Sequence, residues 1–181
     1  MQNPRYALVA YVRNAVGEFV ENLRQELHPD LPHLPAHVTI LPPRCLNGGE
    51  IAALETLEDV CGQTEPFDVT LGDVETFVPV TPTVFIRVAH GSQGMRELHD
   101  RLNTKALAYT EQWPYMPHLT IVKVINEELA QQAYIFSRDR WALFTGSRRI
   151  ALSELTFVRE EDQNRWVDLA GIHLGRSIAN R

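Results

Sequence analysis

The tetrapeptides His37-Val38-Thr39-Ile40 and His118-Leu119-Thr120-Ile121 share one pattern, in which histidine and threonine alternate with aliphatic residues. Such alternation predicts two short β-strands, because successive side chains of a strand point to opposite faces of its sheet. Each histidine should therefore share a face with the threonine two residues later. A pair of histidines can act as a metal-free acid and base near neutral pH, because the ordinary imidazole pKa is about 6.5.

The sequence around the two tetrapeptides predicts an internal repeat. In each half of the chain we expect the order strand, helix, histidine strand, helix and strand, with nearly equal spacing between the elements. The expected elements besides the two histidine strands are 6–12, 16–27, 50–61 and 67–78 in the first half, 84–88, 93–108, 127–136 and 149–158 in the second, and a last strand over 166–174. The junction between the halves is Pro79-Val80-Thr81-Pro82.

One duplication of this kind predicts a pseudo-twofold axis. The two His-x-Thr strands would then face each other across a central cleft. We expect residues 1–181 to form one domain of two pseudo-symmetric lobes, with halves of about 1–80 and 81–181. The alternative is chance, because α+β chains of this length often alternate strands and helices, although chance rarely repeats the same tetrapeptide at the matching place.

Composition is that of a packed protein of 181 residues, 44% hydrophobic and 22% charged. The net charge of −6 argues against capture of long nucleic acids, which requires many Lys and Arg contacts to phosphates. A small anionic substrate in a locally basic cleft is compatible with this net charge.

Cys45 and Cys61 fit neither a disulfide framework nor a Cys-x-x-Cys site. Because the apolar run 6–12 is too short for a signal peptide or a membrane span, we expect a cytoplasmic protein that does not bind membranes. We also expect a monomer.

The two tetrapeptides and their flanks resemble the paired His-hydrophobic-Thr/Ser-hydrophobic motifs of the 2H (two-histidine) phosphoesterase superfamily. The branch of 2′-5′ RNA ligase-like cyclic phosphodiesterases is the most similar. The second motif is the better match, because Pro117 to Lys123 ends in a base where family members often carry Arg or Lys. The resemblance implies a bilobal α+β fold, with antiparallel sheets lining a central cleft and helices packed outside. It also implies metal-free action on 2′,3′-cyclic phosphates or 2′-5′ phosphodiester linkages.

Hydrolysis of a cyclic phosphodiester needs an activated water, a proton for the departing ribose oxygen and donors for the charged non-bridging oxygens. His37 and His118 can serve as base and acid, in an order that the sequence leaves open. Thr39 and Thr120 are expected to donate to the non-bridging oxygens, because each hydroxyl lies beside its imidazole.

Two basic residues are candidates for contact with the substrate. Lys123 either sits near the phosphate, which requires a twist or bulge after Ile121, or is a solvated charge at the strand end. Arg44 follows Pro42-Pro43, which could either aim it at the cleft or end the strand early and leave it in solvent.

Base stacking would need aromatic side chains at the cleft edge. Trp113 and Tyr115 lie just before His118, and Tyr11 and Phe85 lie on the opening strands of the two halves. Aromatic side chains at such positions more often belong simply to the core or the rim.

We expect neither a metal nor a cofactor. His28, His33 and His37 are close in sequence, but the prolines between them prevent a helix that would align them, and no acidic ligand accompanies them. The leading hypothesis is a metal-independent phosphoesterase acting on 2′,3′-cyclic phosphate ends of RNA or small nucleotides. Its alternatives are 2′-5′ RNA ligation, a non-catalytic module that binds nucleotides or RNA ends, and a scaffold whose histidines and threonines only cap the sheet.

Overall fold

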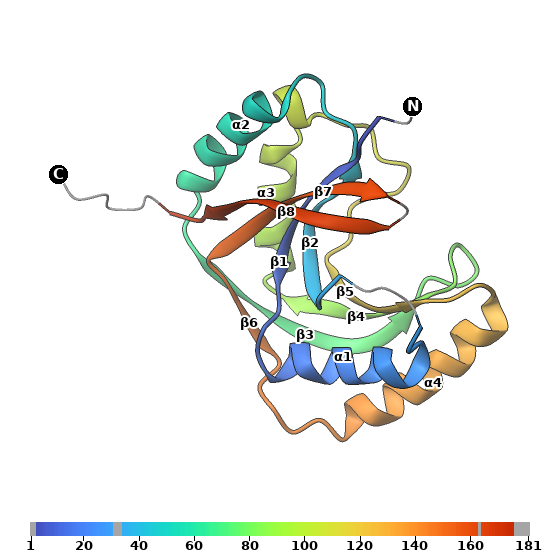
Figure 1. The fold of residues 1–181 in the computed structure, drawn as a ribbon. Helices are drawn as coiled ribbons and strands as arrows, with labels where there is room; N and C mark the ends of the chain where they lie inside the picture. The colour runs from blue at the N-terminus through green and yellow to red at the C-terminus, as the bar shows by residue number, and fades with distance from the viewer. Residues whose placement is uncertain (1–2, 31–33, 163, 176–181) are drawn as a thin grey trace.

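The computed structural model describes residues 3–30, 34–162 and 164–175 (Figure 1). The strands in these ranges are β1 (Tyr6–Tyr11), β2 (His37–Arg44), β3 (Phe67–Thr76), β4 (Thr83–His90), β5 (His118–Lys123), β6 (Arg149–Leu152), β7 (Glu154–Asp162) and β8 (Arg165–His173). The helices are α1 (Ala15–Leu27), α2 (Glu50–Gly62), α3 (Ser92–Leu102) and α4 (Glu127–Ala142), together with the short 3-10 helix η1 (Lys105–Leu107).

The strands form one antiparallel sheet in the order β6-β3-β4-β5-β2-β1-β7-β8. Its centre is the pair β2 and β5, the two strands that carry the tetrapeptides, where Val38 pairs with Leu119. The expected α+β class with antiparallel strands is confirmed. The repeat is visible in the order of strands, because β2-β1-β7-β8 and β5-β4-β3-β6 extend in opposite directions from this central pair.

Strands from the two sequence halves are exchanged across the sheet. β3 comes from the first half but pairs with β4, whereas β7 and β8 come from the second half and lie beside β1. Figure 1 shows α1 and α4 together against the β3, β4 and β5 side, and α2 and α3 against the other side. The division into lobes near residue 80 stays a prediction. The four strands from β5 to β6 and the four from β2 to β8 each include strands of both sequence halves.

Three predicted elements need correction. The strand expected over 149–158 is two strands separated by Ser153, because β6 pairs with β3 while β7 pairs with β1. The helix expected over 93–108 ends at Leu102, where the next residue, Asn103, uses its side-chain oxygen to accept from the main-chain N–H of Tyr109. The last helix continues from 136 to Ala142, because buried Trp141 packs it onto the sheet and donates to the carbonyl of Gly72.

The core lies between the sheet and the helices. The aliphatic members of the tetrapeptides are no more than 1% exposed; they are Val38, Ile40, Leu119 and Ile121. Their histidines and threonines point to the opposite face and are half-buried. The alternation that predicts the two strands is therefore confirmed, and the buried aliphatic residues hold both motifs against the core.

Helix α1 is fixed to the sheet at its first turn. The side chain of Asn14 caps it by accepting from the main-chain N–H groups of Val16 and Gly17. A Cβ at Gly17 would lie 1.8 Å from the carbonyl oxygen of Val12, so only glycine permits this close approach to the end of β1. Among the residues that the structure describes, no helix has the length and apolar character needed to cross a membrane.

Candidate active site

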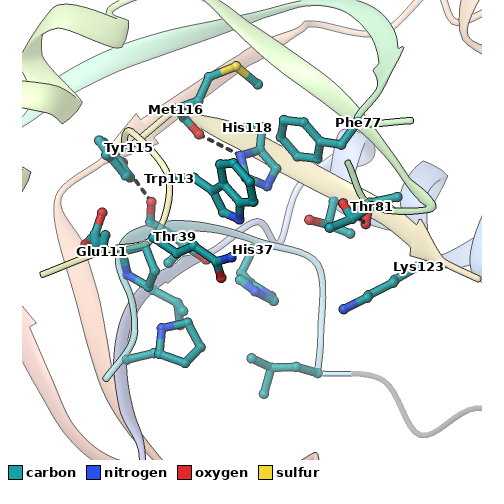
Figure 2. Close-up of a pocket in the computed structure, with 18 of the residues that line it drawn as sticks. His37, Thr39, Phe77, Thr81, Glu111, Trp113, Tyr115, Met116, His118 and Lys123 are labelled. Atoms are coloured by element: carbon teal, nitrogen blue, oxygen red, sulfur yellow. Dashed lines mark hydrogen bonds between the residues drawn. The ribbon is translucent and has the colours of Figure 1, made fainter. Parts of the chain in front are cut away.

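A cavity of about 890 Å³ opens where β2 and β5 meet, and the four predicted catalytic residues line it. His37 and Thr39 come from β2, and His118 and Thr120 come from β5. Figure 2 shows His37, Thr39 and His118 around the cavity. Because Val38 pairs with Leu119 in antiparallel register, His37 lies across from Thr120, and Thr39 lies across from His118. Each imidazole thus has a hydroxyl from its own strand and one from the partner strand beside it.

Both tetrapeptides contain a β-bulge at their isoleucine. The register between β1 and β2 skips Ile40, and the register between β4 and β5 skips Ile121. The pairs on either side are Leu41 with Leu8, Thr39 with Val9, Val122 with Val84 and Thr120 with Phe85. A bulge bends its strand and redirects the side chains that follow, so the two motifs are bent at equivalent positions.

The two imidazoles are held in the same way by the main chain. Nδ1 of His37 lies 2.7 Å from the carbonyl oxygen of Pro35, and Nδ1 of His118 lies 2.6 Å from that of Met116. A carbonyl oxygen can only accept, so each Nδ1 carries a hydrogen and donates it. In the neutral imidazole the other nitrogen, Nε2, is then a free base.

Burial favours the neutral form of both histidines. It is the main cause that lowers the pKa of His37 to about 4, with a smaller contribution from the charges of Arg24 and His118. Burial also lowers the pKa of His118. Both imidazoles are therefore neutral in the free protein at pH 7, and a bound phosphate, being negatively charged, would favour protonation of either one.

The surroundings of the two histidines differ. His118 makes edge-on contacts with the rings of Phe77 and Phe85, at centroid distances of 5.1 and 5.2 Å. His37 instead feels the positive charge of Arg24, a buried residue of α1 that lines the same cavity. The Arg24 charge adds to burial in opposing protonation of His37, whereas burial alone lowers the pKa of His118.

Tyr115 links the loop before β5 to the first motif. Its hydroxyl donates to the carbonyl oxygen of Thr39 at 2.7 Å (Figure 2). Its ring stacks on buried His99, with the ring centroids 4.1 Å apart. The residue lines the cavity, as expected, but one ring face and the hydroxyl are already engaged.

The structure contradicts both interpretations of Arg44. β2 continues through Pro42-Pro43, and the Arg44 side chain is 1% exposed and does not line the cavity. Its guanidinium forms an ion pair with Glu111 and donates to Asn103 at 2.9 Å and to the carbonyl of Leu107 at 3.0 Å. Arg44 therefore holds the loop that leads to Tyr115, and its donors are used within the protein.

Lys123 does reach the cavity, although it would face away from His118 on a regular strand. The bulge at Ile121 reverses the side-chain alternation, as the interpretation of Lys123 as a phosphate neighbour requires. Figure 2 shows its ammonium pointing toward the space beside His37. The loop residue Trp113 also lines the cavity and is 56% exposed, so its ring is accessible.

Tyr11 and Phe85 are placed differently. Tyr11 does not line the cavity: it packs beside Ala7, Val9 and Val158, and its hydroxyl donates to Asp168 at 2.5 Å. Phe85 is 1% exposed and supports His118 from the core. Neither ring is available for a substrate in this arrangement.

Other residues line the cavity that the sequence analysis did not select. Arg24 had a detectable signal, because it follows Val16 and Val20 at intervals of four residues and so lies on the apolar face of α1. Thr81 belongs to the segment interpreted only as a junction, and Trp166 to the last strand. No local pattern marks these two, because the folding of distant segments brings them to the cleft.

Within the described ranges, no group of three or more His, Cys, Asp or Glu side chains is placed to hold a metal ion. His33 lies outside the described residues, so the grouping of His28, His33 and His37 is untested.

Comparisons with known proteins agree with this architecture. A candidate phosphoesterase of Oceanobacillus iheyensis is 25% identical over 68% of this chain and 73% of its own. A candidate phosphoesterase of Bacillus cytotoxicus is 22% identical over 95% of this chain and 98% of its own.

The crystal structure of Escherichia coli LigT with 3′-AMP matches with a TM-score of 0.63 at 16% identity, over 96% of this chain and 99% of that one. TT0787 of Thermus thermophilus matches with a TM-score of 0.66 at 14% identity, over the same shares. These two likenesses show the fold. The family model of the 2′-5′ RNA ligase superfamily matches residues 12–164, and the chain therefore belongs to this superfamily.

Proposed function

We propose that this protein is a metal-independent phosphoesterase that hydrolyses 2′,3′-cyclic phosphate ends of RNA or of small nucleotides. The observation that supports this most is the pair of imidazoles, each with Nδ1 bound to a carbonyl, in one cavity with two threonine hydroxyls. Two fixed Nε2 atoms in one cleft supply the base and the acid that the reaction needs.

In this mechanism one histidine accepts a proton from water through Nε2 as the water oxygen attacks phosphorus. The bond between phosphorus and one ribose oxygen breaks, and the protonated Nε2 of the other histidine gives that oxygen a proton. The product is a ribose with one hydroxyl and one phosphomonoester. Water loses one proton and the ribose oxygen gains one, so the two histidines exchange protonation states. Proton exchange with solvent then returns each histidine to its starting state.

The contrast between the histidines favours His37 as the base and His118 as the acid. Arg24 opposes a positive charge on His37 in addition to burial, whereas burial alone opposes one on His118. This assignment is part of the proposal, because the sequence leaves the order open.

Four residues are assigned to the substrate's charge and base. Thr39 and Thr120 donate to the non-bridging oxygens, because neither hydroxyl has a hydrogen bond to another described residue and both line the cavity. Lys123 attracts the phosphate as a point charge. Trp113 offers an accessible ring for stacking of a nucleobase, a contact generally worth about 1–3 kcal/mol.

Related proteins support a substrate of this class. Escherichia coli LigT, which shares the fold, has been crystallised with 3′-AMP and with phosphate. A nucleoside 3′-phosphate is one of the two products that hydrolysis of a 2′,3′-cyclic phosphate can yield.

The test is turnover of 2′,3′-cyclic AMP and of an RNA oligonucleotide with a 2′,3′-cyclic end, both with EDTA present. We expect hydrolysis of at least one, and no hydrolysis of either contradicts the proposal. A parallel assay with paired RNA halves distinguishes hydrolysis from 2′-5′ ligation, the activity for which the superfamily is named. Binding that survives His37→Ala or His118→Ala, without turnover by the unsubstituted protein, would identify a non-catalytic binding module instead.

A further inference from the structure

We propose that Arg24 is a positioning residue that makes the pseudo-symmetric site functionally asymmetric. From α1 it holds the bulge after His118 and the segment before His37, and it places one buried positive charge beside His37. At the other bulge, the Thr39 carbonyl is held by the neutral hydroxyl of Tyr115 instead. The inference rests on the proposed function for its effect on turnover, but not for its effect on His37 itself.

The contacts of Arg24 join the two motifs. Its Nε donates to the carbonyl of Ile121 at 2.8 Å and its Nη2 to that of Thr120 at 2.7 Å, so the guanidinium binds the bulge directly. Its Nη1 donates to the carbonyl of Leu34 at 2.9 Å, just before the carbonyl of Pro35 that holds His37. One side chain therefore fixes the geometry on which both histidines and Lys123 depend.

A second residue of α1 completes this clamp. Glu21, one turn before Arg24, accepts from the main-chain N–H of Ala36 at 3.1 Å. Residues 34–36 are thus held by a donor and an acceptor from the same helix face. The segment that orients the His37 ring cannot shift without breaking contacts to α1.

The charge of Arg24 is not needed for these hydrogen bonds. The equivalent bulge in the first motif is held by a neutral donor, the Tyr115 hydroxyl on the carbonyl of Thr39. Arg24 is only 5% exposed, and within the described residues no carboxylate lies within 4.0 Å of it. Only the longer-range attraction of Glu21 offsets its burial, and burying a charge without a close ion pair costs free energy that a neutral donor avoids. A cation at the wall of the cleft attracts an anionic substrate, and it favours the neutral form of His37.

Several charged or titratable groups share the cavity with His37. They are Arg24 from α1, His118 and Lys123 from β5, Glu111, Tyr109 and Tyr115 from the loop before β5, and Arg5 from the segment before β1. Of these, Arg24 and His118 lower the pKa of His37, and Arg24 is the larger of the two. Removing the Arg24 charge should therefore raise the His37 pKa while leaving the other groups in place.

Substitutions can separate the charge of Arg24 from its hydrogen bonds. Arg24→Met removes both, Arg24→Gln removes the charge but keeps amide donors, and Arg24→Lys keeps the charge but cannot reach three carbonyls at once. Tyr115→Phe removes the neutral donor at the other bulge. Arg140→Met is the matched control, because this exposed arginine of α4 pairs with Glu26 and does not line the cavity.

The primary measurement is the NMR titration of the imidazole signals in each folded variant without substrate, with the His37 signal assigned from His37→Gln. We expect the His37 pKa to rise by about half a pH unit in Arg24→Met and Arg24→Gln, an upward shift of the size that one nearby charge produces in a partly screened site. Arg24→Lys, Tyr115→Phe and Arg140→Met should leave it unchanged. An unchanged His37 pKa in a folded neutral variant overturns the proposal, whatever the turnover assays give.

Turnover of 2′,3′-cyclic AMP tests the positioning role. Arg24→Lys should reduce kcat about tenfold or more with the acidic limb of the pH profile unmoved, because misplacement of a catalytic group by less than 1 Å is costly. In the neutral variants that limb should move to higher pH. An unchanged kcat in Arg24→Lys overturns the positioning role. If neither neutral variant folds, the kcat of Arg24→Lys is the measurement that tests the proposal.

Discussion

The hydroxyl of Tyr115 and the carbonyl oxygen of Thr39 are joined by a 2.7 Å hydrogen bond that connects the two motifs. The next residue after Tyr115 is Met116, whose carbonyl holds the His118 ring. The loop before β5 is therefore anchored to the first motif and orients the second. This connection gives Tyr115 a role in alignment of the site, rather than only in base stacking.

Tyr115→Phe should lower kcat several-fold while changing KM little. The variant loses the hydroxyl that holds the loop, while the ring keeps its stacking on His99. Loss of one hydrogen bond should reduce the free energy of unfolding by about 1 kcal/mol. Steady-state kinetics and urea denaturation check the two values, and unchanged kcat together with unchanged stability would contradict this alignment role.

Arg44→Met should destabilise the protein by about 3–5 kcal/mol, because Glu111 and the surrounding carbonyls would lose a fully buried partner. Arg87→Met is the control, since its pair with Glu75 is exposed and should contribute less than about 1 kcal/mol. Urea denaturation of both variants gives the comparison. Equal effects of the two substitutions would show that the Arg44 network does not hold the loop.

Lys123→Gln should raise KM for a cyclic nucleotide about tenfold, because a cation beside the phosphate is lost. The chain has one other lysine, Lys105, which is exposed in η1 and does not line the cavity. Lys105→Gln should leave KM unchanged. The difference in KM between the two variants should shrink at high salt, since screening weakens charge attraction; a KM unaffected by Lys123→Gln would return this residue to the solvated strand end.

Stability should fall as the pH is lowered from about 6.5 toward 4. In the unfolded chain His37 has its ordinary pKa of about 6.5, whereas in the folded protein burial lowers that pKa to about 4. The unfolded state therefore binds more protons in this window. The contribution of neutral His37 to stability is complete above pH 6.5 and is lost as the pH falls through the folded pKa. His37→Gln should flatten this dependence by an amount on the order of 3 kcal/mol. Thermal unfolding across the range checks it, and identical pH profiles of the two proteins would contradict the lowered pKa.

The sequence predicts the fold class and the position of the four central residues because both follow from local alternation. Val38 and Leu119 alternate with histidine and threonine, and burial of these aliphatic residues fixes which face each histidine takes. The repeated order of elements then brings the two strands together at the centre of the sheet.

Features that depend on distant contacts could not be predicted in the same way. The strand over 149–158 is divided at Ser153 because its two parts pair with different strands, a fact that no local pattern contains. Arg44 is buried because Glu111 and Leu107 arrive from a loop more than sixty residues away. Arg24 stood on the apolar face of a predicted helix, where a charged residue signals a buried partner, and its partners are main-chain carbonyls of β5 and of the segment before β2.

The most direct test of the central claim is the rate of 2′,3′-cyclic AMP hydrolysis in EDTA by the unsubstituted protein, His37→Ala, His118→Ala and the double variant. Each single substitution should lower kcat by about 10²–10⁴-fold, the usual contribution of general acid–base catalysis. Because the two imidazoles act as one unit, the double variant should be little slower than either single variant. Hydrolysis that continues at the unsubstituted rate after removal of either histidine would contradict the two-histidine mechanism.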